Sequence, residues 1–591
     1  MPNDADLVTV PSELLGWAVN VWPTDLPFHS EKSTHADVLG FISEKAKGVL
    51  AWSSEKATHV VTWSSQHVSD ALCVSINVSC RKKPELFDQP GGVVFFCILA
   101  FSNVFALLVL ISVVGGFVTR LLDPAAAFAR TLRDPRAHAF ANMQREVLGK
   151  TSLTVLVPCY LPNEQLIVKS TIAHLIHNLE YSFPFRLIVC YNTPSPIAFE
   201  DELRELDGYV YANGRSVQIL KVEGSSSKAE NLNCALLSVD TEYVALYDAD
   251  HHPDAHSLLI ASAHMAARGV ACVQGSTYLR SLPNFMAVYI NAEFFVTHFV
   301  FFPAMQFLTS FGIFGGSNAL WRTAILKAYQ FRHDVQTEDI DVSIRSSLDG
   351  RVKISFCPEC RSGELPPRTF NDLYRQRLRW ALGWDQVTLQ HMRSIGSSTE
   401  LNCAEKAGMY YLLPLRWALL LSGVANALVA PIVASAWANG VGGELGGPIE
   451  TCYAFSFTTY VTLFAVAAIN AILHEPRQRW PAIIAFQLTG AVYIGWNLAL
   501  YFISLIKICT GADSEWVVTT RAPDVPSRAR TAGLAYLHPS DTCASSPRPE
   551  LSVVLSTPMQ AAFAMSCEKE LVEKYNAARG EVSDRGPIPM L

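Results

Sequence analysis

Long runs without a charged residue are the clearest pattern along the chain. About 20 apolar residues cross the hydrocarbon core of a bilayer, so a run of that length predicts a transmembrane helix. Four runs meet this requirement, namely residues 89–119, 417–438, 452–473 and 481–506. The first run begins too far into the chain, and lacks the flanking pattern, to be a cleaved signal peptide. We therefore expect one transmembrane helix at 91–119 and about three within 409–508.

A fifth apolar stretch, residues 294–314, is about as long as these runs but contains several interruptions. His298, Pro303 and Gln306 lie within it. The polar motifs on both sides of this stretch must share one compartment if they act together, which a complete crossing would prevent. We expect it to form an interfacial or buried helix.

The distribution of basic residues predicts how the chain is oriented. Residues 120–150 hold six Lys and Arg against three acidic residues, while the loop at 439–450 holds neither Lys nor Arg. The short loop at 474–480 contains Arg477 and Arg479. Because basic loops face the cytosol, we expect residues 120–408 to be cytosolic. The sequence thus predicts an integral membrane protein in contact with the lipid bilayer, and we expect it in the cell membrane.

The two ends of the chain differ from its middle. Within residues 1–90, SEKAKGVLAWS at 43–53 is repeated as SEKATHVVTWS at 54–64, with a period of 11 residues. This period places the apolar residues on one stripe of a helix. Such a helix either packs on its own protein or lies on a membrane surface. Residues 509–591 are polar and rich in Pro and Ser, which is typical of a linker and tail.

Between the apolar runs, the pattern changes to short apolar segments that end in polar turns. TSLTVLVP, RLIVCY and EYVALYDAD have the length and residue types of buried strands, and residues 164–179 separate the first two with a helical pattern. This alternation predicts a doubly wound parallel sheet that binds ligands at the carboxyl ends of its strands. We place this cytosolic α/β domain at residues 120–408.

Composition supports this organisation and excludes some partners. Only 17% of the residues are charged, whereas soluble domains contain about 25%, which agrees with a chain that lies partly in lipid. The net charge of −7 does not favour a polyanion, so we expect no nucleic-acid partner. The 14 cysteines are scattered, as in a reduced cytosolic protein. Cys357 and Cys360 form a single CxxC pair, and because zinc needs four ligands we expect two thiols at a strand end.

The motif Asp248-Ala249-Asp250 directly follows a predicted strand. Residues i and i+2 of a strand point to the same face, so both carboxylates would lie together. Two carboxylates are suited to Mg²⁺ or Mn²⁺ carrying a diphosphate. The alternative is a turn that favours Asp for its backbone hydrogen bonds. For His251 and His252, which follow, we expect the role of neutral turn residues.

A second acidic motif, Thr337-Glu338-Asp339, lies in a polar stretch after the glycine-rich turn FGGSN. A carboxylate at this place could act as a general base if it lies within reach of the hydroxyl that it deprotonates. The alternative is structural, because Thr followed by acidic residues is favourable at the start of a helix.

A third motif, QRLRW, falls on a predicted helix. Gln376, Arg379 and Trp380 occupy positions i, i+3 and i+4, which lie on one helical face. Arg can neutralise a departing diphosphate, and an indole offers a flat apolar surface to a sugar ring. The alternative is a membrane anchor, for which an Arg-Trp pair is also suited.

In this order, on one α/β domain flanked by apolar runs, the motifs resemble those of the membrane-embedded family 2 glycosyltransferases, which include cellulose, chitin, curdlan and hyaluronan synthases. The resemblance covers about residues 120–510. Smaller matches are TVLVPCYLPNE at 154–164, KAENLN at 228–233, VQG at 273–275 and FGGSNALWR at 314–322. WVVTTR at 516–521 looks like the gating loop of cellulose synthases. At Asn192 the chain departs from the many relatives that carry an Asp for the nucleotide base.

The resemblance implies a role for each matching residue. The base that deprotonates the acceptor would be Asp339, with Glu338 and Thr337 in the same catalytic motif. The donor diphosphate would be bound by Asp248, Lys228, Gln376, Arg379 and Glu164, and the metal by Asp250. The acceptor sugar would lie against Trp380, Gly316 and Ser317. A gating loop formed by Trp516, Thr519 and Arg521 would close over the donor.

The resemblance also implies a GT-A fold inserted between transmembrane helices, and an activity. The expected enzyme is an inverting hexosyltransferase, dependent on Mg²⁺ or Mn²⁺, that polymerises a UDP-sugar onto a growing polysaccharide and moves the β-linked product across the membrane. Transfer of one sugar to a ceramide or polyprenyl lipid is an alternative. A transporter or scaffold that has lost catalysis is a third reading, which the intact acidic motifs disfavour.

Overall fold

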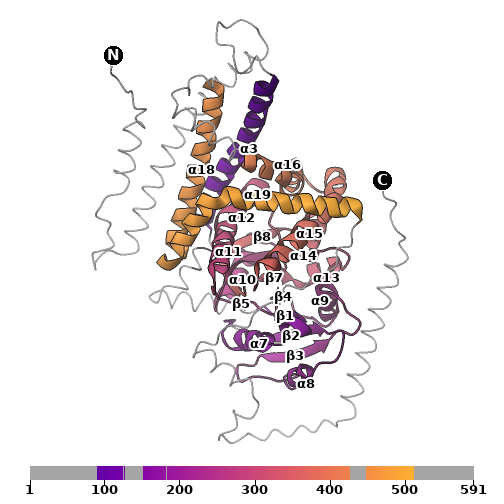
Figure 1. Cartoon of the computed structure of the whole chain (residues 1–591). Coiled ribbons are helices and arrows are strands. Elements are labelled where there is room, and N and C mark those ends of the chain that lie inside the picture. Colours follow the sequence, from indigo (N-terminus) through magenta and orange to yellow (C-terminus); the bar gives the residue numbers. More distant parts are fainter. Residues whose placement is uncertain are drawn as a thin grey trace, which may run out of the picture. The chain divides into compact units, whose positions relative to one another are not determined.

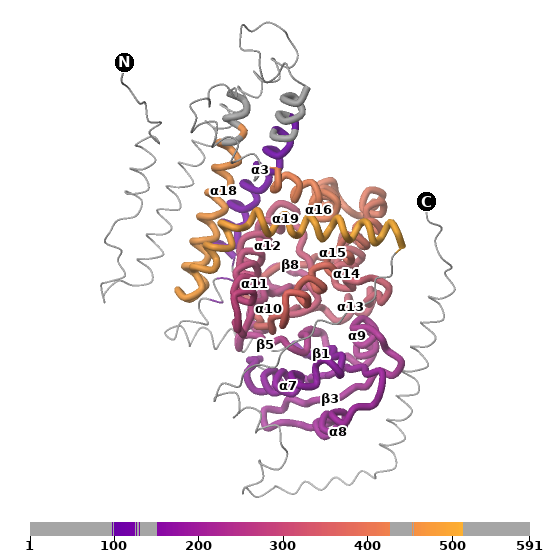
Figure 2. Tube along the Cα trace, viewed as in Figure 1, coloured from indigo at the N-terminus to yellow at the C-terminus, as the bar shows by residue number. Residues whose placement is uncertain are grey.

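The computed structural model describes residues 90–123, 126, 129, 151–181, 183–425 and 447–511. Figure 1 shows the helices and strands of this part of the chain, and Figure 2 traces the same path as a tube. The repeat at 43–64, most of the apolar run at 417–438 and the candidate gating loop at 516–521 lie outside the described residues. Expectations for those segments therefore stay predictions.

Strands of the described residues form one mixed sheet. Across the sheet, their order is β3 (Ser216–Lys221), β2 (Arg186–Asn192), β1 (Leu153–Tyr160), β4 (Tyr243–Leu246), β7 (Ala319–Arg322), β6 (Cys272–Leu279), β8 (Ile354–Glu364) and β5 (His252–Pro253). The first four strands in this order are parallel to one another. However, β7 is antiparallel to both β4 and β6, and β5 is antiparallel to β8. The prediction that the whole sheet is parallel is therefore wrong.

The reversed direction of β7 follows from the turn that precedes it. The glycine-rich turn at 314–318 ends beside the carboxyl end of β4, where Ala319 pairs with Leu246. A strand that enters the sheet at this end can only run back along β4. The alternation of apolar and polar residues carries no information about strand direction, so the sequence pattern did not reveal this reversal.

Helices cover both faces of the sheet, as predicted for a doubly wound α/β domain. One face packs against α7 (Val168–His177), α8 (Phe199–Arg204) and α10 (Ser257–Arg268), and the other against α9 (Lys228–Leu237), α13 (Thr323–Tyr329) and α14 (Glu338–Ser347). In β1, Val155 and Val157 join the first core cluster and Leu156 joins the second, because successive side chains of a strand alternate between faces. A strand covered on both faces is continuously apolar.

The remaining described helices lie before, within and after this domain. They are α3 (Pro90–Leu121), α6 (Leu161–Glu164), α11 (Phe285–Val296), the π-helix η3 (Thr297–Phe301), α12 (Phe302–Thr309), α15 (Phe370–Ser397), α16 (Cys403–Leu412), α18 (Gly447–His474), the 3-10 helix η5 (Arg477–Arg479) and α19 (Trp480–Thr510). A short apolar helix, Leu415–Ala425, is the described part of the run predicted at 417–438.

Four helical segments of the described residues are long and apolar enough to cross a membrane. They are Ala100–Leu121, Phe285–Thr309, Ala454–His474 and Arg477–Thr510. The predicted helices at 91–119, 452–473 and 481–506 are thus confirmed as helices of sufficient length. In Figure 1, α3 and α18 extend side by side away from the sheet, and the two helices are in contact.

The segment Phe285–Thr309 differs from the other three in its packing. Inside the protein, 56% of its most apolar window is buried, against 28% or less for the others. It packs between α3 and α19, and a π-helical turn precedes Pro303. Such a turn is expected next to a proline, which interrupts the regular hydrogen bonding of a helix. This extensive burial agrees with our expectation of a buried helix.

Candidate active site

The centre of the candidate site lies at the carboxyl end of β4, where the acidic motif meets the start of α9. The Nζ atom of Lys228 lies 2.5 Å from Oδ1 of Asp248 and 3.9 Å from Oε1 of Glu338. The backbone N–H of Asp248 donates to Oγ of Ser317 at 2.9 Å. Three segments that are distant in the sequence therefore meet here: the end of β4, the start of α9 and the glycine-rich turn.

Gly316, in the glycine-rich turn, lies next to both Lys228 and Asp339. Its carbonyl accepts a hydrogen bond from Nζ of Lys228 at 2.9 Å. Its φ angle is +86°, and a Cβ at this position would lie 2.8 Å from Oδ2 of Asp339. Glycine is thus required here by both backbone conformation and space. The absent side chain lets the Asp339 carboxylate and the Lys228 ammonium approach the same turn.

Charge and burial strongly perturb the titration of these groups. Burial and the negative charge of Glu338 raise the pKa of Asp339 from 3.8 to about 7, although the positive charges of Lys228 and Arg379 oppose this rise. For Lys228, burial acts to lower the pKa, but the charges of Asp248 and Glu338 raise it above its ordinary value. At neutral pH the site thus holds a permanent cation beside a carboxylate that can accept a proton.

The glycine-rich turn is fixed by two buried amide side chains from the predicted motifs. The Nε2 atom of Gln274 donates to the carbonyl of Ser317 at 2.9 Å, and its Oε1 accepts from the N–H of Gly315 at 2.8 Å. Asn318 donates through Nδ2 to the carbonyls of Ser276 and Cys360, each at 2.8 Å. The VQG and FGGSN matches thus belong to one structure, which the sequence signalled only through the resemblance.

Asp248, Asp250 and His251 form a group that could hold a metal ion. Each offers a ligand atom, and these atoms lie within 4.8 Å of one another. Asp250 is only 1% exposed, and its Oδ2 accepts from the N–H of Leu365 at 3.1 Å. Two carboxylates and an imidazole fit a divalent cation such as Mn²⁺. His251, for which we expected only a turn role, therefore lies among the candidate ligands.

His251 is itself held from both sides. Its Nδ1 lies 3.0 Å from Oγ of Ser362 and its Nε2 lies 3.2 Å from Oε2 of Glu364. His252 lies outside this group and stacks on His174, with ring centroids 4.4 Å apart. The carboxyl end of β8 is thus part of the site. Glu364 belongs to the stretch at 363–380 that resembles the family's approach to the QRLRW motif, whereas no sequence signal pointed to Ser362.

The QRLRW motif lies on α15, which packs against the start of α14. A Cβ on Gly383 would lie 2.3 Å from Cγ2 of Thr337, so this glycine allows the two helices to approach closely. Arg379 donates to the carbonyl of Gln336 at 3.3 Å, and its charge acts on Asp339. Arg379 thus lies near the start of α14, and its donor-binding role stays a prediction. Gln376 is buried and Trp380 is half-buried.

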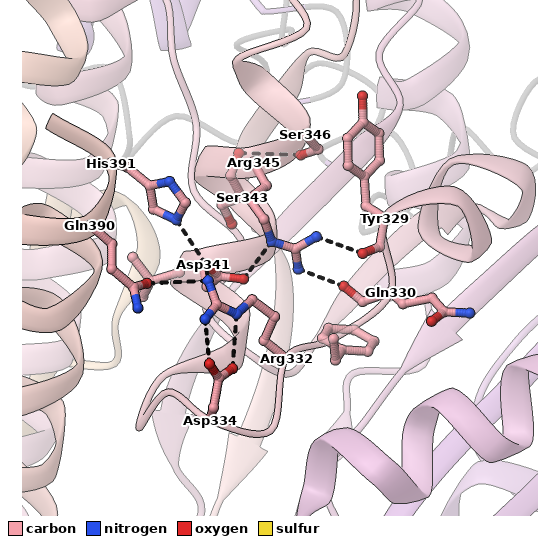
Figure 3. A network of polar contacts seen from close by, with 12 residues as sticks. Tyr329, Gln330, Arg332, Asp334, Asp341, Ser343, Arg345, Ser346, Gln390 and His391 are labelled. Atoms are coloured by element: carbon pink, nitrogen blue, oxygen red, sulfur yellow. Dashed lines mark hydrogen bonds and ion pairs between the residues drawn. The ribbon is translucent and has the colours of Figure 1, made fainter. Parts of the chain in front are cut away.

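A polar network holds α14 in place behind Asp339. Figure 3 shows Asp341, which accepts from Nε2 of His391 at 2.8 Å and from Nε of Arg345 at 2.6 Å. Burial alone would raise the pKa of Asp341, but these two hydrogen bonds hold it below its usual value. Arg345 also donates to the carbonyls of Tyr329 and Gln330. This ionised aspartate joins α14 to α15 and to the preceding loop.

Glu164, for which a donor contact is predicted, lies after β1, and Asn192, where the chain departs from its relatives, lies at the end of β2. Glu164 accepts from the N–H of Tyr160 at 2.8 Å, which closes the turn after β1. Asn192 donates to the carbonyl of Ser225 at 3.0 Å and accepts from Nδ2 of Asn231 at 2.8 Å. The side-chain nitrogen of Asn192 is thus engaged with the loop before α9, and its side-chain oxygen with α9 itself. The contact of Glu164 to the donor stays a prediction.

The cysteine pair and the gating residues complete the predicted set. Cys357 and Cys360 are buried free thiols within β8. They lie inside the strand and not at its end, where we expected them. Trp516, Thr519 and Arg521 lie outside the described residues.

Comparisons with known proteins agree with this geometry. Residues 154–329 match the family described as "Glycosyl transferase family 2", and residues 243–473 match "Glycosyl transferase family group 2". A protein named "Probable glucomannan 4-beta-mannosyltransferase 7" from Oryza sativa subsp. japonica is 27% identical over 236 residues, which are 38% of this chain and 40% of that protein. A "Poly-beta-1,6-N-acetyl-D-glucosamine synthase" from Staphylococcus epidermidis is 25% identical over 253 residues, which are 42% of this chain and 58% of that protein.

A solved mannosyltransferase from Pyrobaculum calidifontis, in complex with GDP-Man and Mn²⁺, is 19% identical with a TM-score of 0.35, and covers 63% of this chain and 100% of its own. The matched regions span only about half of the two curated relatives. The family matches and the α/β architecture nevertheless agree on residues 154–473. This part of the chain therefore matches family 2 glycosyltransferase domains and folds as a mixed α/β sheet covered by helices.

Proposed function

We propose that this glycosyltransferase is an inverting, metal-dependent and processive enzyme that polymerises a UDP-sugar into a β-linked polysaccharide and moves the product across a membrane. The observation that carries the proposal is the position of Asp339. Its carboxylate lies close to Gly316, to which Lys228 also donates a hydrogen bond, and the positive charge of Arg379 acts on it. The two relatives are named as a 4-beta-mannosyltransferase and a poly-beta-1,6-linked polymer synthase. Their names support a β-linked polysaccharide product.

In the proposed reaction, Asp339 accepts the proton of the acceptor hydroxyl. The oxygen then attacks the anomeric carbon of the donor, and the bond from that carbon to the UDP oxygen breaks. Attack from the side opposite the leaving group inverts the configuration, so an α-linked donor gives a β-linkage. A base with a pKa near 7 is well matched to this step at neutral pH.

Fixed positive charges would stabilise the leaving diphosphate. Lys228 is poised beside Asp248, and Arg379 approaches the same cluster from α15. Such preorganised charges stabilise a departing anion without reorganising in the transition state. Asp248, Asp250 and His251 would hold the divalent ion, which when bound supplies further positive charge to the diphosphate. Gln376 and Glu164 would complete the donor site.

The acceptor end of the growing chain would lie between Trp380 and the turn formed by Gly316 and Ser317. The apolar helices on both sides of the domain support a membrane-embedded enzyme. We propose that residues 91–119 and 409–508 span the cell membrane and that residues 120–408 face the cytosol, where nucleotide sugars are available. The gating role of 516–521 belongs to the same proposal and requires that this segment also faces the cytosol.

Donor and product can be identified with the purified full-length protein in lipid nanodiscs containing Mn²⁺ or Mg²⁺. We would supply UDP-glucose, UDP-N-acetylglucosamine, UDP-glucuronate and, because one relative is named a mannosyltransferase, GDP-mannose, and then measure nucleotide release and product size. A long polymer formed from a UDP-sugar is the expected result. Addition of one sugar to a lipid would overturn the processive assignment, and use of GDP-mannose alone would overturn the UDP-sugar assignment. Asp201→Asn, in the exposed first turn of α8, serves as a matched active control.

A further inference from the structure

Arg377 lies within the QRLRW motif, and its side chain is only 5% exposed. Its Nη2 atom lies 2.8 Å from Oε2 of Glu293, a residue of α11 whose side chain is 7% exposed. A buried guanidinium and a buried carboxylate thus join the helix of the QRLRW motif to a segment long enough to cross a membrane.

A third residue completes the contact. The hydroxyl of Tyr493, on α19, donates to Oε1 of Glu293 at 2.5 Å. Both oxygens of Glu293 are therefore engaged, one by α15 and the other by α19. The three helices meet at one carboxylate, although these residues lie about 84 and 200 positions apart in the sequence.

The same guanidinium lies against Trp380. The Cζ atom of Arg377 is 4.3 Å from the centroid of the indole ring. Trp380 also packs against an apolar cluster that includes Leu279 and Phe294. A cation over an aromatic face is attracted by the ring electrons, most strongly where water is excluded. The guanidinium therefore restrains the plane of the indole and is itself restrained by Glu293.

Stability alone is a weak explanation for such a pair. Removing two charges from water is costly, and replacing a buried ion pair by apolar residues of similar volume is often neutral or stabilising. The planar guanidinium, however, fixes direction as well as distance, because it can donate to a carboxylate while stacking on a ring. Orientation of the indole is the property that an apolar replacement would lose.

We propose that Glu293 and Arg377 are positioning residues for Trp380: they fix the indole plane on which the acceptor sugar stacks, and they tie its orientation to α11 and α19. The inference rests on the acceptor role of Trp380 in the proposed function. Because a 1 Å misplacement of a reacting group can cost about a hundredfold in rate, a loosened indole should reduce repeated elongation more than donor binding.

The chain provides a matched control for this test. Asp385 of α15 forms a second ion pair with Arg416 of the helix Leu415–Ala425, and Asp385 also accepts from Nε1 of Trp417 at 3.0 Å. Asp385 is fully buried, as Glu293 nearly is. Among the contacts of the described residues, this pair does not include Trp380. Breaking the Asp385–Arg416 pair should lower the stability to a similar extent without loosening the indole of Trp380.

The experiment compares E293Q, the double variant E293L/R377M, D385N and the unchanged protein, all full length in nanodiscs. The double variant removes the pair without leaving an unpaired charge, so it keeps the test valid if E293Q does not fold. We would measure thermal unfolding, UDP binding, kcat and KM for an oligosaccharide acceptor, and product length. For E293Q and the double variant we expect shorter products and about a tenfold loss in kcat/KM for the acceptor, with UDP affinity unchanged.

The outcomes separate this inference from the proposed function. If the unchanged protein forms no polymer, the proposed function fails first and the acceptor role of Trp380 fails with it. If it does form polymer and the folded double variant makes products of the same length with the same acceptor KM, the positioning role is overturned. An equal loss of product length in D385N would also overturn it, because any weakened contact of α15 would then suffice.

Discussion

The Oδ2 atom of Asp339 lies 2.8 Å from the point where a Cβ would stand on Gly316. The two residues are 23 positions apart in the sequence, yet the carboxylate of Asp339 occupies the space that a side chain on Gly316 would need. Gly316 also has a φ of +86°, so its backbone conformation and its missing side chain serve the same arrangement.

Gly316→Ala should therefore displace the carboxylate and reduce activity by at least tenfold. The substitution also strains the backbone, at about 1–2 kcal/mol for a positive φ. Gly208→Ala is the matched control, because Gly208 has a φ of +72° but no atom within 4 Å of an added Cβ. Both variants should show a lowered Tm, whereas only Gly316→Ala should lose turnover. Equal activities of the two variants would contradict the proposed contact.

Asp339→Asn should abolish sugar transfer while leaving donor binding nearly intact. An amide retains the shape of the side chain but cannot accept the proton, and loss of a general base typically costs about 10²–10⁴ in rate. Isothermal titration with UDP and a turnover assay on the same preparation measure the two properties. Turnover at the unmodified rate would reject Asp339 as the base.

Activity should fall with decreasing pH as Asp339 becomes protonated near pH 7. The negative charge of Glu338 contributes to this raised pKa, so Glu338→Gln should shift the acidic limb of the kcat profile to lower pH. Glu205→Gln, at an exposed position after α8, should leave the limb unchanged. An acidic limb that does not move in Glu338→Gln would show that another group controls it.

The same raised pKa predicts a pH-dependent stability. Because the folded state holds the Asp339 proton more tightly than the unfolded state, its contribution to stability is complete below about pH 4 and is lost as pH rises through about 7. The decrease in Tm between pH 5 and pH 8 should therefore be smaller for Asp339→Asn than for the unchanged protein. Thermal unfolding in both buffers provides the comparison, and identical decreases would contradict the shift.

A divalent cation should stabilise the folded protein before any substrate is added. A ligand at one hundred times its Kd contributes about 2.7 kcal/mol, so Mn²⁺ should raise the Tm measurably and a chelator should reverse the rise. Asp250→Asn should remove this response because Asp250 is a buried member of the candidate ligand group. Asp201→Asn should retain it. A full response in Asp250→Asn would place the ion elsewhere.

Some of the site could be predicted from residue order alone. The apolar run before Asp248 indicated a strand, and the order of the three motifs suggested one catalytic domain. The structure brings Lys228, Asp248 and Asp339 together as expected. The contribution of His251 could not be predicted in this way, because a histidine after a strand is equally suited to a turn. Glu364 lies in a stretch that resembles the family, but the resemblance did not indicate its contact with His251.

By itself, the sequence determined the apolar helices, the strands that are buried on both faces and the helical spacing of the QRLRW motif. These are local properties, because side-chain periodicity and run length are set by neighbouring residues. Only the tertiary structure decided the reversed direction of β7, the approach of Gly316 to Asp339 and the meeting of α11, α15 and α19 at Glu293. Each of these three features depends on which distant segments pack together. Close packing and the pairing of buried charges determine such contacts, whereas local periodicity does not.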